Sequence, residues 1–494
     1  MSQINWKERA EHMNFNGQAF INDQRVDAVS GATFECISPC DGRKLADVAR
    51  CDKADVDVAV KVAREAFEDG RWAHLSPRKR KEILIRFADL IVQSKSELAL
   101  TETLDMGKPI SNALAVDVMG AQNTIRWFGE AIDKIYDEVA PTPRDSLALI
   151  TREPIGVVAA VVPWNYPLLM TSWKIAPALA VGNSVILKPS EKSPLTALRL
   201  AELALEAGIP AGVFNVVTGF GHEAGAALAE HMDVDCVAFT GSTAVGKRIM
   251  AAAANSNLKR AWMELGGKSP NIVFADCPDM DAAAAAAGNV FYNQGESCNA
   301  PTRLYVQASI KDEFMKKVAA HVASFQPGDP LDPATTMGAI VDDIQLNNVL
   351  KYIQSGKTEG AELIAGGQQC RQESGGYFIE PTIFVTNKDH TIAREEIFGP
   401  VLSAMTFETE AEAIALANDS IYGLQAGVWT ADISRAHRVA RALRAGTVHI
   451  NQYNDDDITV PFGGYKQSGN GRDKSLHSMD KYCELKTTWV KIDY

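Results

Sequence analysis

One cysteine of the chain lies in a segment that suits nucleophilic chemistry. Cys298 follows a predicted helix that ends within 288–292 and a glycine-containing turn, and it precedes a strand predicted from Arg303. A thiol in such a connecting loop is accessible to substrate, and backbone N–H groups beside it can lower its pKa. Most loop cysteines have no catalytic role, so Cys298 is a candidate nucleophile that requires partners.

Two other side chains have the chemistry to assist such a nucleophile. Glu264 lies among the apolar residues of 262–265, and partial desolvation would raise its pKa toward that of a general base. The glycine pair at 266–267 lets the backbone approach a neighbour or ligand closely. Asn165, in the proline-bounded turn 163–167, could donate its amide N–H to a developing oxyanion. A surface glutamate and an ordinary turn are the structural alternatives.

The elements that must position these residues alternate between strands and helices. Continuous Val, Ile and Ala runs predict buried strands, and Ala-rich stretches between them predict helices. This order predicts a parallel sheet covered on both faces, with ligands at the carboxyl ends of its strands. A second α/β region is predicted after Lys268. The predicted strands are 157–162, 184–188, 214–218, 236–240, 271–274, 303–306 and 447–452, and the predicted helices are 174–181, 196–207, 224–231, 244–254, 281–290 and 311–325.

The first predicted sheet carries features of an anion site. The segment 240–246 joins a strand to a helix through a glycine-containing turn, and free N–H groups at such a helix N-terminus favour a phosphate. The segment lacks the G-x-G-x-x-G order, which weakens the signal. Lys188 and Glu191, at the end of an earlier strand, would place a cation and a carboxylate near the ribose of a dinucleotide. Helix capping is the alternative role for each of these segments.

Composition excludes several other classes of function. The 494 residues include 62 acidic and 49 basic side chains, a net charge of −13, so a surface for nucleic acid or an anionic membrane is not expected. No secretory signal is recognisable, and the longest apolar run, 155–163, is too short to span a bilayer, which predicts a cytoplasmic protein. The eight cysteines and nine histidines lack metal-ligand spacing, so reduced thiols and no structural metal are expected.

Two segments differ from the alternating pattern. The polar stretch 137–150 precedes the first predicted strand, and 486–492 alternates apolar and polar residues near the end of the chain. Each is predicted to be an edge strand that pairs with another subunit. A loose surface ribbon is the alternative.

Seven segments, taken together in their order and spacing, resemble the aldehyde dehydrogenase superfamily. The resemblance implies an α/β fold with a Rossmann-type NAD-binding domain (1–134 and 153–265), an α/β catalytic domain (266–470) and a small β oligomerisation element (135–152 and 471–494) of a homodimer or homotetramer. The segments are Pro-Trp-Asn at 163–165, Lys-Pro-Ser-Glu at 188–191, Phe-Thr-Gly-Ser-Thr at 239–243 with Gly246, Glu-Leu-Gly-Gly-Lys at 264–268, Asn-Gln-Gly-Glu-Ser-Cys at 293–298, Glu-Glu-Ile-Phe-Gly-Pro at 395–400 and Pro-Phe-Gly-Gly-Tyr-Lys at 461–466.

The resemblance also implies a role for each matching residue. Cys298 would attack an aldehyde, the Asn165 amide and the Cys298 N–H would bind the oxyanion, and Glu264 would activate the water that hydrolyses the thioester. A carboxylate at Glu191 would repel a 2′-phosphate, so NAD is favoured over NADP. The cofactor-binding residues implied by the resemblance are Trp164, Lys188, Glu191, Gly241, Ser242, Gly246, Glu396 and Phe398.

The residues implied for the substrate pocket are partly polar. Ser297 and Asn299 flank the nucleophile, and Asp456 and Asp457 lie near the expected mouth, which favours a cationic or strongly hydrogen-bonding aldehyde. The chain is similar to the γ-glutamyl-γ-aminobutyraldehyde dehydrogenase group. The alternatives are a broad-specificity aliphatic or aromatic enzyme, a CoA-acylating relative, which Glu264 disfavours, a cysteine hydrolase without nucleotide, and an inactive scaffold. The expected tunnel walls are Tyr166, Met170, Trp173 and Phe462.

Overall fold

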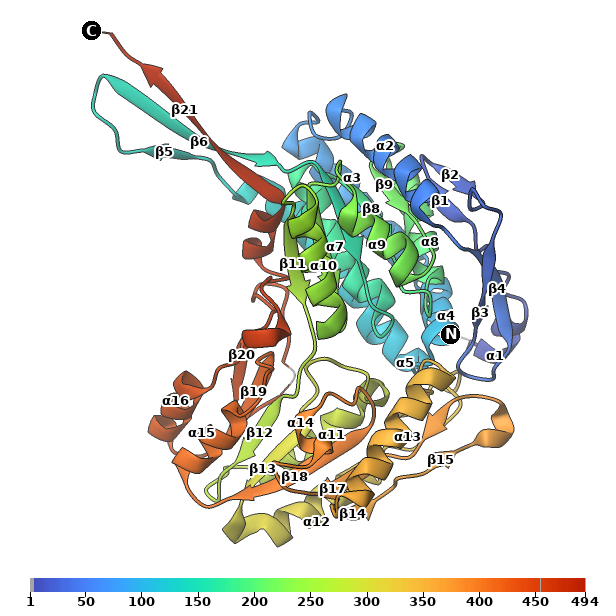
Figure 1. Ribbon diagram of the computed structural model, residues 1–494, viewed down its shortest axis with the longest axis vertical. Helices are drawn as coiled ribbons and strands as arrows, with labels where there is room; N and C mark the ends of the chain where they lie inside the picture. The colour runs from blue at the N-terminus through green and yellow to red at the C-terminus, as the bar shows by residue number, and fades with distance from the viewer. Residues whose placement is uncertain (1–3, 454, 494) are drawn as a thin grey trace.

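Two seven-stranded sheets form the frame of the molecule in this computed structural model, which describes residues 4–453 and 455–493 (Figure 1). The first sheet has the order β11-β10-β7-β8-β9-β1-β2. Its five strands from β11 to β9 are parallel, and β1 and β2 extend it in antiparallel fashion. These strands are β1 (Ala19–Ile21), β2 (Gln24–Val26), β7 (Val157–Val161), β8 (Ser184–Lys188), β9 (Phe214–Val216), β10 (Cys236–Thr240) and β11 (Arg260–Glu264).

The first sheet confirms the predicted parallel architecture. All residues of β7 and β8 are buried, as their continuous apolar sequences require for strands covered on both faces. Because the chain runs from β7 outward through β8 and β9 and then returns to β10 on the other side of β7, the strand order reverses at β7. The carboxyl ends of β7 and β10 therefore border the crevice in which α/β sheets bind ligands.

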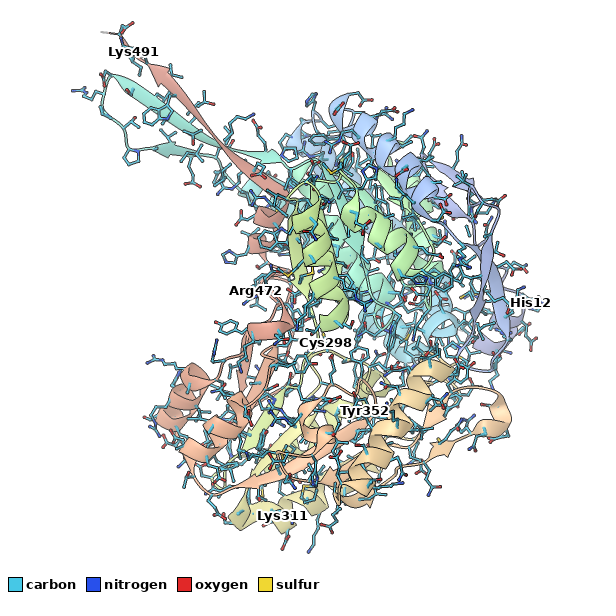
Figure 2. All side chains as sticks on the ribbon, viewed as in Figure 1. His12, Cys298, Lys311, Tyr352, Arg472 and Lys491 are labelled. Carbon is cyan, nitrogen blue, oxygen red and sulfur yellow. The ribbon has the colours of Figure 1, made fainter. Side chains whose placement is uncertain are left out.

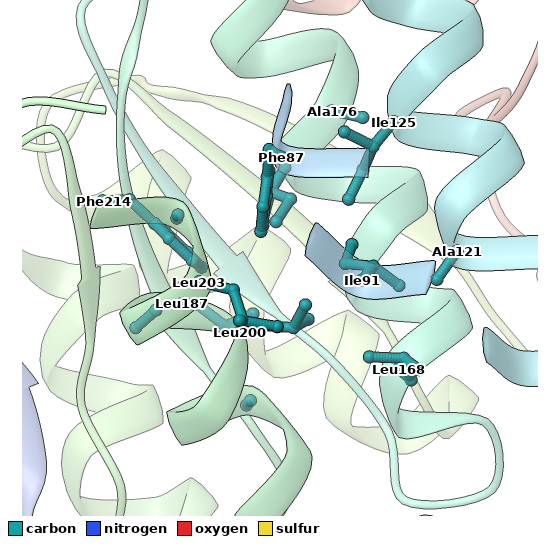
Figure 3. Packing of buried hydrophobic residues seen from close by; sticks show 14 of the residues in the cluster. Phe87, Ile91, Ala121, Ile125, Leu168, Ala176, Leu187, Leu200, Leu203 and Phe214 are labelled. Atoms are coloured by element: carbon teal, nitrogen blue, oxygen red, sulfur yellow. The ribbon is translucent and has the colours of Figure 1, made fainter. Parts of the chain in front are cut away.

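Helices cover this sheet and supply most of its core. Figure 3 shows Phe87 of α3, Ile125 of α6 and Leu203 of α8 packed in one buried cluster. Helix α7 begins at Pro167 rather than at 174 as predicted, because proline suits the first helical position. The predicted helix 224–231 is a π-helical turn, Gly221–Gly225, followed by a short α9. Helices on this side are α1 (Trp6–Glu11), α2 (Lys53–Glu68), α3 (Pro77–Gln93), α4 (Lys95–Met106), α5 (Ile110–Asn112), α6 (Met119–Ala131), α7 (Pro167–Val181), α8 (Leu195–Ala207), α9 (Ala226–Glu230) and α10 (Thr243–Asn255).

The second sheet has the order β14-β17-β18-β13-β12-β19-β20 and is parallel except for β14. It confirms the second α/β region predicted after Lys268. Its strands are β12 (Pro270–Val273), β13 (Arg303–Gln307), β14 (Glu362–Ala365), β17 (Thr382–Val385), β18 (Val401–Phe407), β19 (Gln425–Trp429) and β20 (Thr447–Ile450). Its helices are α11 (Met280–Gly288), α12 (Lys311–Val322), α13 (Asp343–Thr358), α14 (Thr391–Arg394), α15 (Glu410–Asn418) and α16 (Ile433–Ala442).

A three-stranded antiparallel sheet projects from the body (Figure 1). It consists of β5 (Glu138–Ala140), β6 (Ser146–Pro154) and β21 (Cys483–Lys491), and β6 pairs along its whole length with β21. The two segments predicted as edge strands are thus strands, and they lie in one sheet of the same chain. We call β5, β6 and β21 the arm. Its pairing with another subunit and the predicted domain boundaries remain predictions.

Two small ribbons complete the described strands, β3 (Thr33–Ile37) with β4 (Lys44–Ala49) and β15 (Gln369–Cys370) with β16 (Phe378–Ile379). In residues 4–453 and 455–493, no helix has both the length and the apolar composition needed to cross a bilayer. The cytoplasmic location remains a prediction.

Candidate active site

A cavity of about 670 Å³ lies between the two large sheets. The segments after β7 and β10 line it from the first sheet, and the loops before β12, β13 and β18 line it from the second. The carboxyl edge of one sheet therefore faces the amino edge of the other. Asn165, Glu264 and Cys298 all line this cavity, so the fold brings the three predicted catalytic side chains to one place. Figure 2 shows Cys298 where the two halves of the molecule meet.

The loop that carries the thiol has an unusual backbone. Asn293, Gln294 and Gly295 have φ angles of 49°, 57° and 75°, all in the left-handed region. Buried Glu296 anchors the loop, because its Oε1 accepts a hydrogen bond of 3.1 Å from Val341 N. Strained residues persist only where the surrounding structure fixes them, and they concentrate at functional sites. The loop thus presents Cys298 in a fixed position.

Cys298 lines the cavity and is only partly exposed. Desolvation, together with smaller contributions from the carboxylates of Glu396 and Glu264, raises its pKa to about 12. A thiolate is disfavoured near carboxylates in a poorly solvated site. At neutral pH the resting group is therefore the thiol, and attack on a carbonyl requires that a base remove its proton.

The Asn165 side chain is oriented for hydrogen-bond donation. It is buried, and its Nδ2 donates to the backbone oxygen of Glu296 over 2.8 Å. Asn293 Nδ2 in turn donates to the backbone oxygen of Asn165 over 3.1 Å. An amide nitrogen has two N–H groups, so the bond to Glu296 fixes the side chain and leaves the second N–H for a ligand.

Glu264 ends β11 as a buried carboxyl group without a hydrogen-bond partner among the described residues. Burial raises its pKa well above the ordinary value, and nearby Asp473 adds to this effect, while Lys174 and Lys481 oppose it. An unpaired buried carboxyl that lines a cavity has the properties of a general acid or base.

A buried ion cluster lies behind Glu264. Asp473 forms two ion pairs of 2.5 Å, from Oδ2 to Lys174 Nζ and from Oδ1 to Lys481 Nζ. Burial raises the pKa of Asp473, but the two lysines lower it more, so the pKa lies below its usual value. The sequence does not reveal this cluster, because Lys174 and Asp473 are 299 residues apart and meet only in the folded chain.

The glycine pair at 266–267 permits the close approach that was predicted, and the groups that come close are Glu396 and Cys298. A Cβ on Gly266 would overlap the carboxylate of Glu396, and a Cβ on Gly267 would overlap the carbonyl oxygen of Cys298. Gly267 N also donates to Glu396 Oε1 over 2.9 Å. Burial raises the pKa of Glu396 to about 7. The segment after Glu264 therefore packs directly on the nucleophile loop.

The predicted nucleotide-binding residues lie on both sides of the cavity. Gly241 and Ser242 line it at the start of α10, and Ser242 caps this helix by accepting a hydrogen bond from Val245 N. Trp164 contacts Phe398 edge-on, with ring centroids 5.2 Å apart, and Phe398 has a φ of 56°.

The remaining predicted nucleotide contacts lie beside the cavity. Lys188 Nζ lies 3.2 Å from Glu191 Oε2 at the end of β8, beyond the cavity lining. A Cβ on Gly246 would overlap the side chain of Leu265, so this glycine lets α10 pack on the residue that follows β11. Thr240 Oγ1, at the cavity wall, is buried without a hydrogen-bond partner in the part of the chain that the structure describes. A helix N-terminus, an orphaned hydroxyl and a partly exposed carboxylate fit the phosphate and ribose groups of a dinucleotide.

The predicted substrate-pocket residues reach the cavity with one exception. Tyr166 Oη and Ser297 Oγ form a hydrogen bond of 2.7 Å beside the nucleophile. Asp457 does not line the cavity, because its Oδ1 accepts hydrogen bonds from the backbone N and Oγ1 of Thr459. The pocket residues that line the cavity as predicted are Tyr166, Met170, Trp173, Ser297, Asn299, Asp456 and Phe462. Lining residues that were not predicted include Val116, Leu169, Tyr292, Gln345 and Asn348.

Comparison with known proteins identifies the family. The sequence model described as "Aldehyde dehydrogenase family" matches residues 26–488. The chain belongs to the aldehyde dehydrogenase family. It is 54% identical over 490 residues to the NADP/NAD-dependent aldehyde dehydrogenase PuuC of Escherichia coli (strain K12), covering 99% of this chain and 98% of that relative.

Two solved structures of aldehyde dehydrogenases are also close to the chain, and each alignment covers 99% of both proteins. An indole-3-acetaldehyde dehydrogenase of P. syringae, a mutant in complex with NAD⁺ and IAA, is 60% identical with a TM-score of 0.98. A γ-glutamyl-γ-aminobutyraldehyde dehydrogenase of Burkholderia cenocepacia J2315 is 58% identical with a TM-score of 0.97. These findings confirm the predicted α/β fold and the prediction of an NAD-dependent aldehyde dehydrogenase. The roles of individual residues remain predictions.

Proposed function

We propose that this aldehyde dehydrogenase oxidises polar aldehydes with an amino-bearing far end, the ω-amino, γ-glutamylamino or guanidino aldehydes, to carboxylic acids. The observation that carries this proposal is the carboxylate of Asp456, 55% exposed, in a cavity whose walls include Trp173 and Phe462. A carboxylate attracts an ammonium group, and aromatic faces favour cations. The name of the Burkholderia relative agrees with this substrate class.

In the proposed reaction, Cys298 is the nucleophile. Its thiolate attacks the aldehyde carbon, and the free N–H of Asn165 together with the Cys298 backbone N–H binds the oxyanion. After oxidation a thioester joins Cys298 to the acyl group. Glu264, whose two carboxylate oxygens have no hydrogen-bond partner among residues 4–453 and 455–493, removes a proton from the water that attacks this thioester, and the acid leaves.

NAD supplies the hydride acceptor when bound. The start of α10 with Gly241 and Ser242 would hold its phosphates, and Lys188 with Glu191 would hold the adenosine ribose. Glu396 and Phe398 would hold the nicotinamide end, with Trp164 packed on Phe398.

A second candidate substrate class is supported by the apolar part of the cavity. Trp173 and Phe462 contact each other at 5.2 Å, and Met170 and Leu169 line the same space. Such a surface suits uncharged aromatic or aliphatic aldehydes, and the P. syringae relative is named for an aromatic one.

The two classes can be separated with one pair of isosteric substrates. Trimethylammoniobutanal and the neutral aldehyde in which carbon replaces its nitrogen have the same shape and differ by one charge. We define the charge ratio as kcat/KM for the cation divided by kcat/KM for the neutral isostere. A charge ratio well above one supports the amino-aldehyde proposal, and a ratio at or below one rejects it. Parallel rates with NAD and NADP measure cofactor preference, which Glu191 is expected to shift toward NAD.

We also propose that the arm joins two copies of the chain. Its exposed apolar side chains include Leu485, Trp489 and Val490, and an exposed strand edge is a template for pairing. Trp489→Lys is expected to reduce the particle mass in analytical ultracentrifugation. An unchanged mass for this variant would count against the arm as the interface.

A further inference from the structure

A buried lysine, Lys474, lies against Asp456, the half-exposed carboxylate of the cavity lining that marks the mouth, and it belongs to none of the predicted site residues. Lys474 follows Asp473, which pairs with Phe462 through two backbone hydrogen bonds of 2.8 and 2.7 Å. Lys474 and Ser475 have φ angles of 59° and 51°, and Ser475 N donates to Ile458 O over 2.7 Å. This backbone joins the segment of Lys474 to the loop that carries Asp456.

The Lys474 side chain lies beneath the aromatic wall. Its Nζ is 5.4 Å from the centroid of Trp173 and 6.0 Å from that of Phe462, both within the range of cation–π attraction. The same Nζ forms an ion pair with Oδ1 of Asp456. The side chain of Lys474 is 2% exposed, whereas that of Asp456 is 55% exposed.

The pairing changes the charge that a substrate meets at the mouth. Asp456 lines the cavity, but the ammonium beside it offsets much of its negative potential. The ion pair uses Oδ1 and leaves Oδ2 to accept a hydrogen bond from substrate. The mouth therefore offers a positioned acceptor with reduced net charge, next to two aromatic rings.

We propose that Lys474 is a positioning residue that sets the charge selectivity of this aldehyde dehydrogenase. By holding Asp456 and offsetting its charge, it weakens the preference for cationic aldehydes and extends the substrate range to neutral, hydrogen-bonding and aromatic ones. This inference rests on the proposed function, because it concerns the far end of the substrate in the same cavity.

The test measures the charge ratio in single and double variants. Lys474→Met keeps the apolar stem, removes the ammonium and is expected to raise the ratio about five- to tenfold, the size expected for one charge near a partly solvated site. Lys474→Arg keeps the charge and is expected to stay within about twofold of wild type. The matched control Lys316→Met removes a charge from an exposed position on α12 and is expected to leave the ratio unchanged.

Measuring the effect of Lys474→Met on the charge ratio in the Asp456→Asn variant as well keeps the test valid if one variant folds poorly. Asp456→Asn alone leaves the lysine uncompensated and is expected to lower the ratio, and adding Lys474→Met is expected to raise it again. A purely structural role for Lys474 would change kcat, KM or stability equally for both isosteres. Unchanged ratios on removal of the lysine in both backgrounds would overturn the inference, whereas the wild-type ratio by itself decides the proposed function.

Discussion

The catalytic centre and the cavity mouth are built by different means. At the centre, backbone contacts set the positions: Gly267 packs on the carbonyl of Cys298, and the Asn165 amide is fixed by the backbone oxygen of Glu296. At the mouth, a side-chain ion pair and two aromatic rings hold a half-exposed Asp456. Chemistry that every substrate shares thus depends on backbone geometry, whereas selectivity depends on side chains that can change one at a time.

The largest effect is expected at the centre from removal of the nucleophile. Cys298→Ala is expected to reduce NADH formation by about 10⁴-fold or more, because no other described thiol lines the cavity. Thermal unfolding followed by circular dichroism checks that the fold is retained. Cys370→Ala, on the short strand β15, is the matched control and should keep near wild-type rates. Substantial activity in Cys298→Ala would refute the assigned nucleophile.

Glu264→Gln is expected to separate the two half-reactions. Oxidation still proceeds once, so a burst of about one NADH per active site should appear before the thioester accumulates. The steady-state rate should fall by about 10²- to 10⁴-fold, the usual contribution of a general base. Stopped-flow absorbance and mass spectrometry of the acylated protein measure both. The absence of both burst and adduct would place Glu264 in the first half-reaction instead.

The pH dependence of the reaction rate tests whether the catalytic centre is desolvated. Cys298, with its pKa raised to about 12, and Glu264, with its raised pKa, both act in their deprotonated forms. The fraction of each active form increases with pH, so kcat/KM, which reports attack by Cys298, and kcat, which includes thioester hydrolysis by Glu264, should both rise between about pH 6 and pH 9, by up to about tenfold per unit for one such group. A flat or falling profile would contradict this assignment. The profile of Glu264→Gln shows how much of the slope belongs to that residue.

A smaller effect is expected at the mouth. Asp456→Asn should raise KM for cationic aldehydes several-fold more than for neutral isosteres, because the carboxylate lines the cavity. Asp457→Asn is the matched control, since the Asp457 carboxylate is bonded to Thr459 and does not line the cavity. Similar KM changes in the two variants would show that lining the cavity does not give Asp456 a special role in selecting cationic aldehydes.

The same contrast explains what the sequence could predict. The bounds of β8 and β10 agree with prediction because each is a short run of buried residues, apart from the partly buried Thr240 at the end of β10. Asn165, Glu264 and Cys298, which line one cavity, could be singled out beforehand because each stands in a contiguous motif. The pairs Lys174–Asp473 and Lys474–Asp456 were not found, because they form only in the tertiary structure. Asp457 resembles Asp456 in sequence, and only the turn to Thr459 separates their surroundings.

The glycine pair at 266–267 also has a practical meaning for protein engineering. Because any added Cβ would overlap Glu396 or the Cys298 carbonyl, neither position accommodates a residue other than glycine. A mutant library intended to change the substrate of this enzyme should hold them constant and randomise 456 and 474 instead, the ion pair at the cavity mouth.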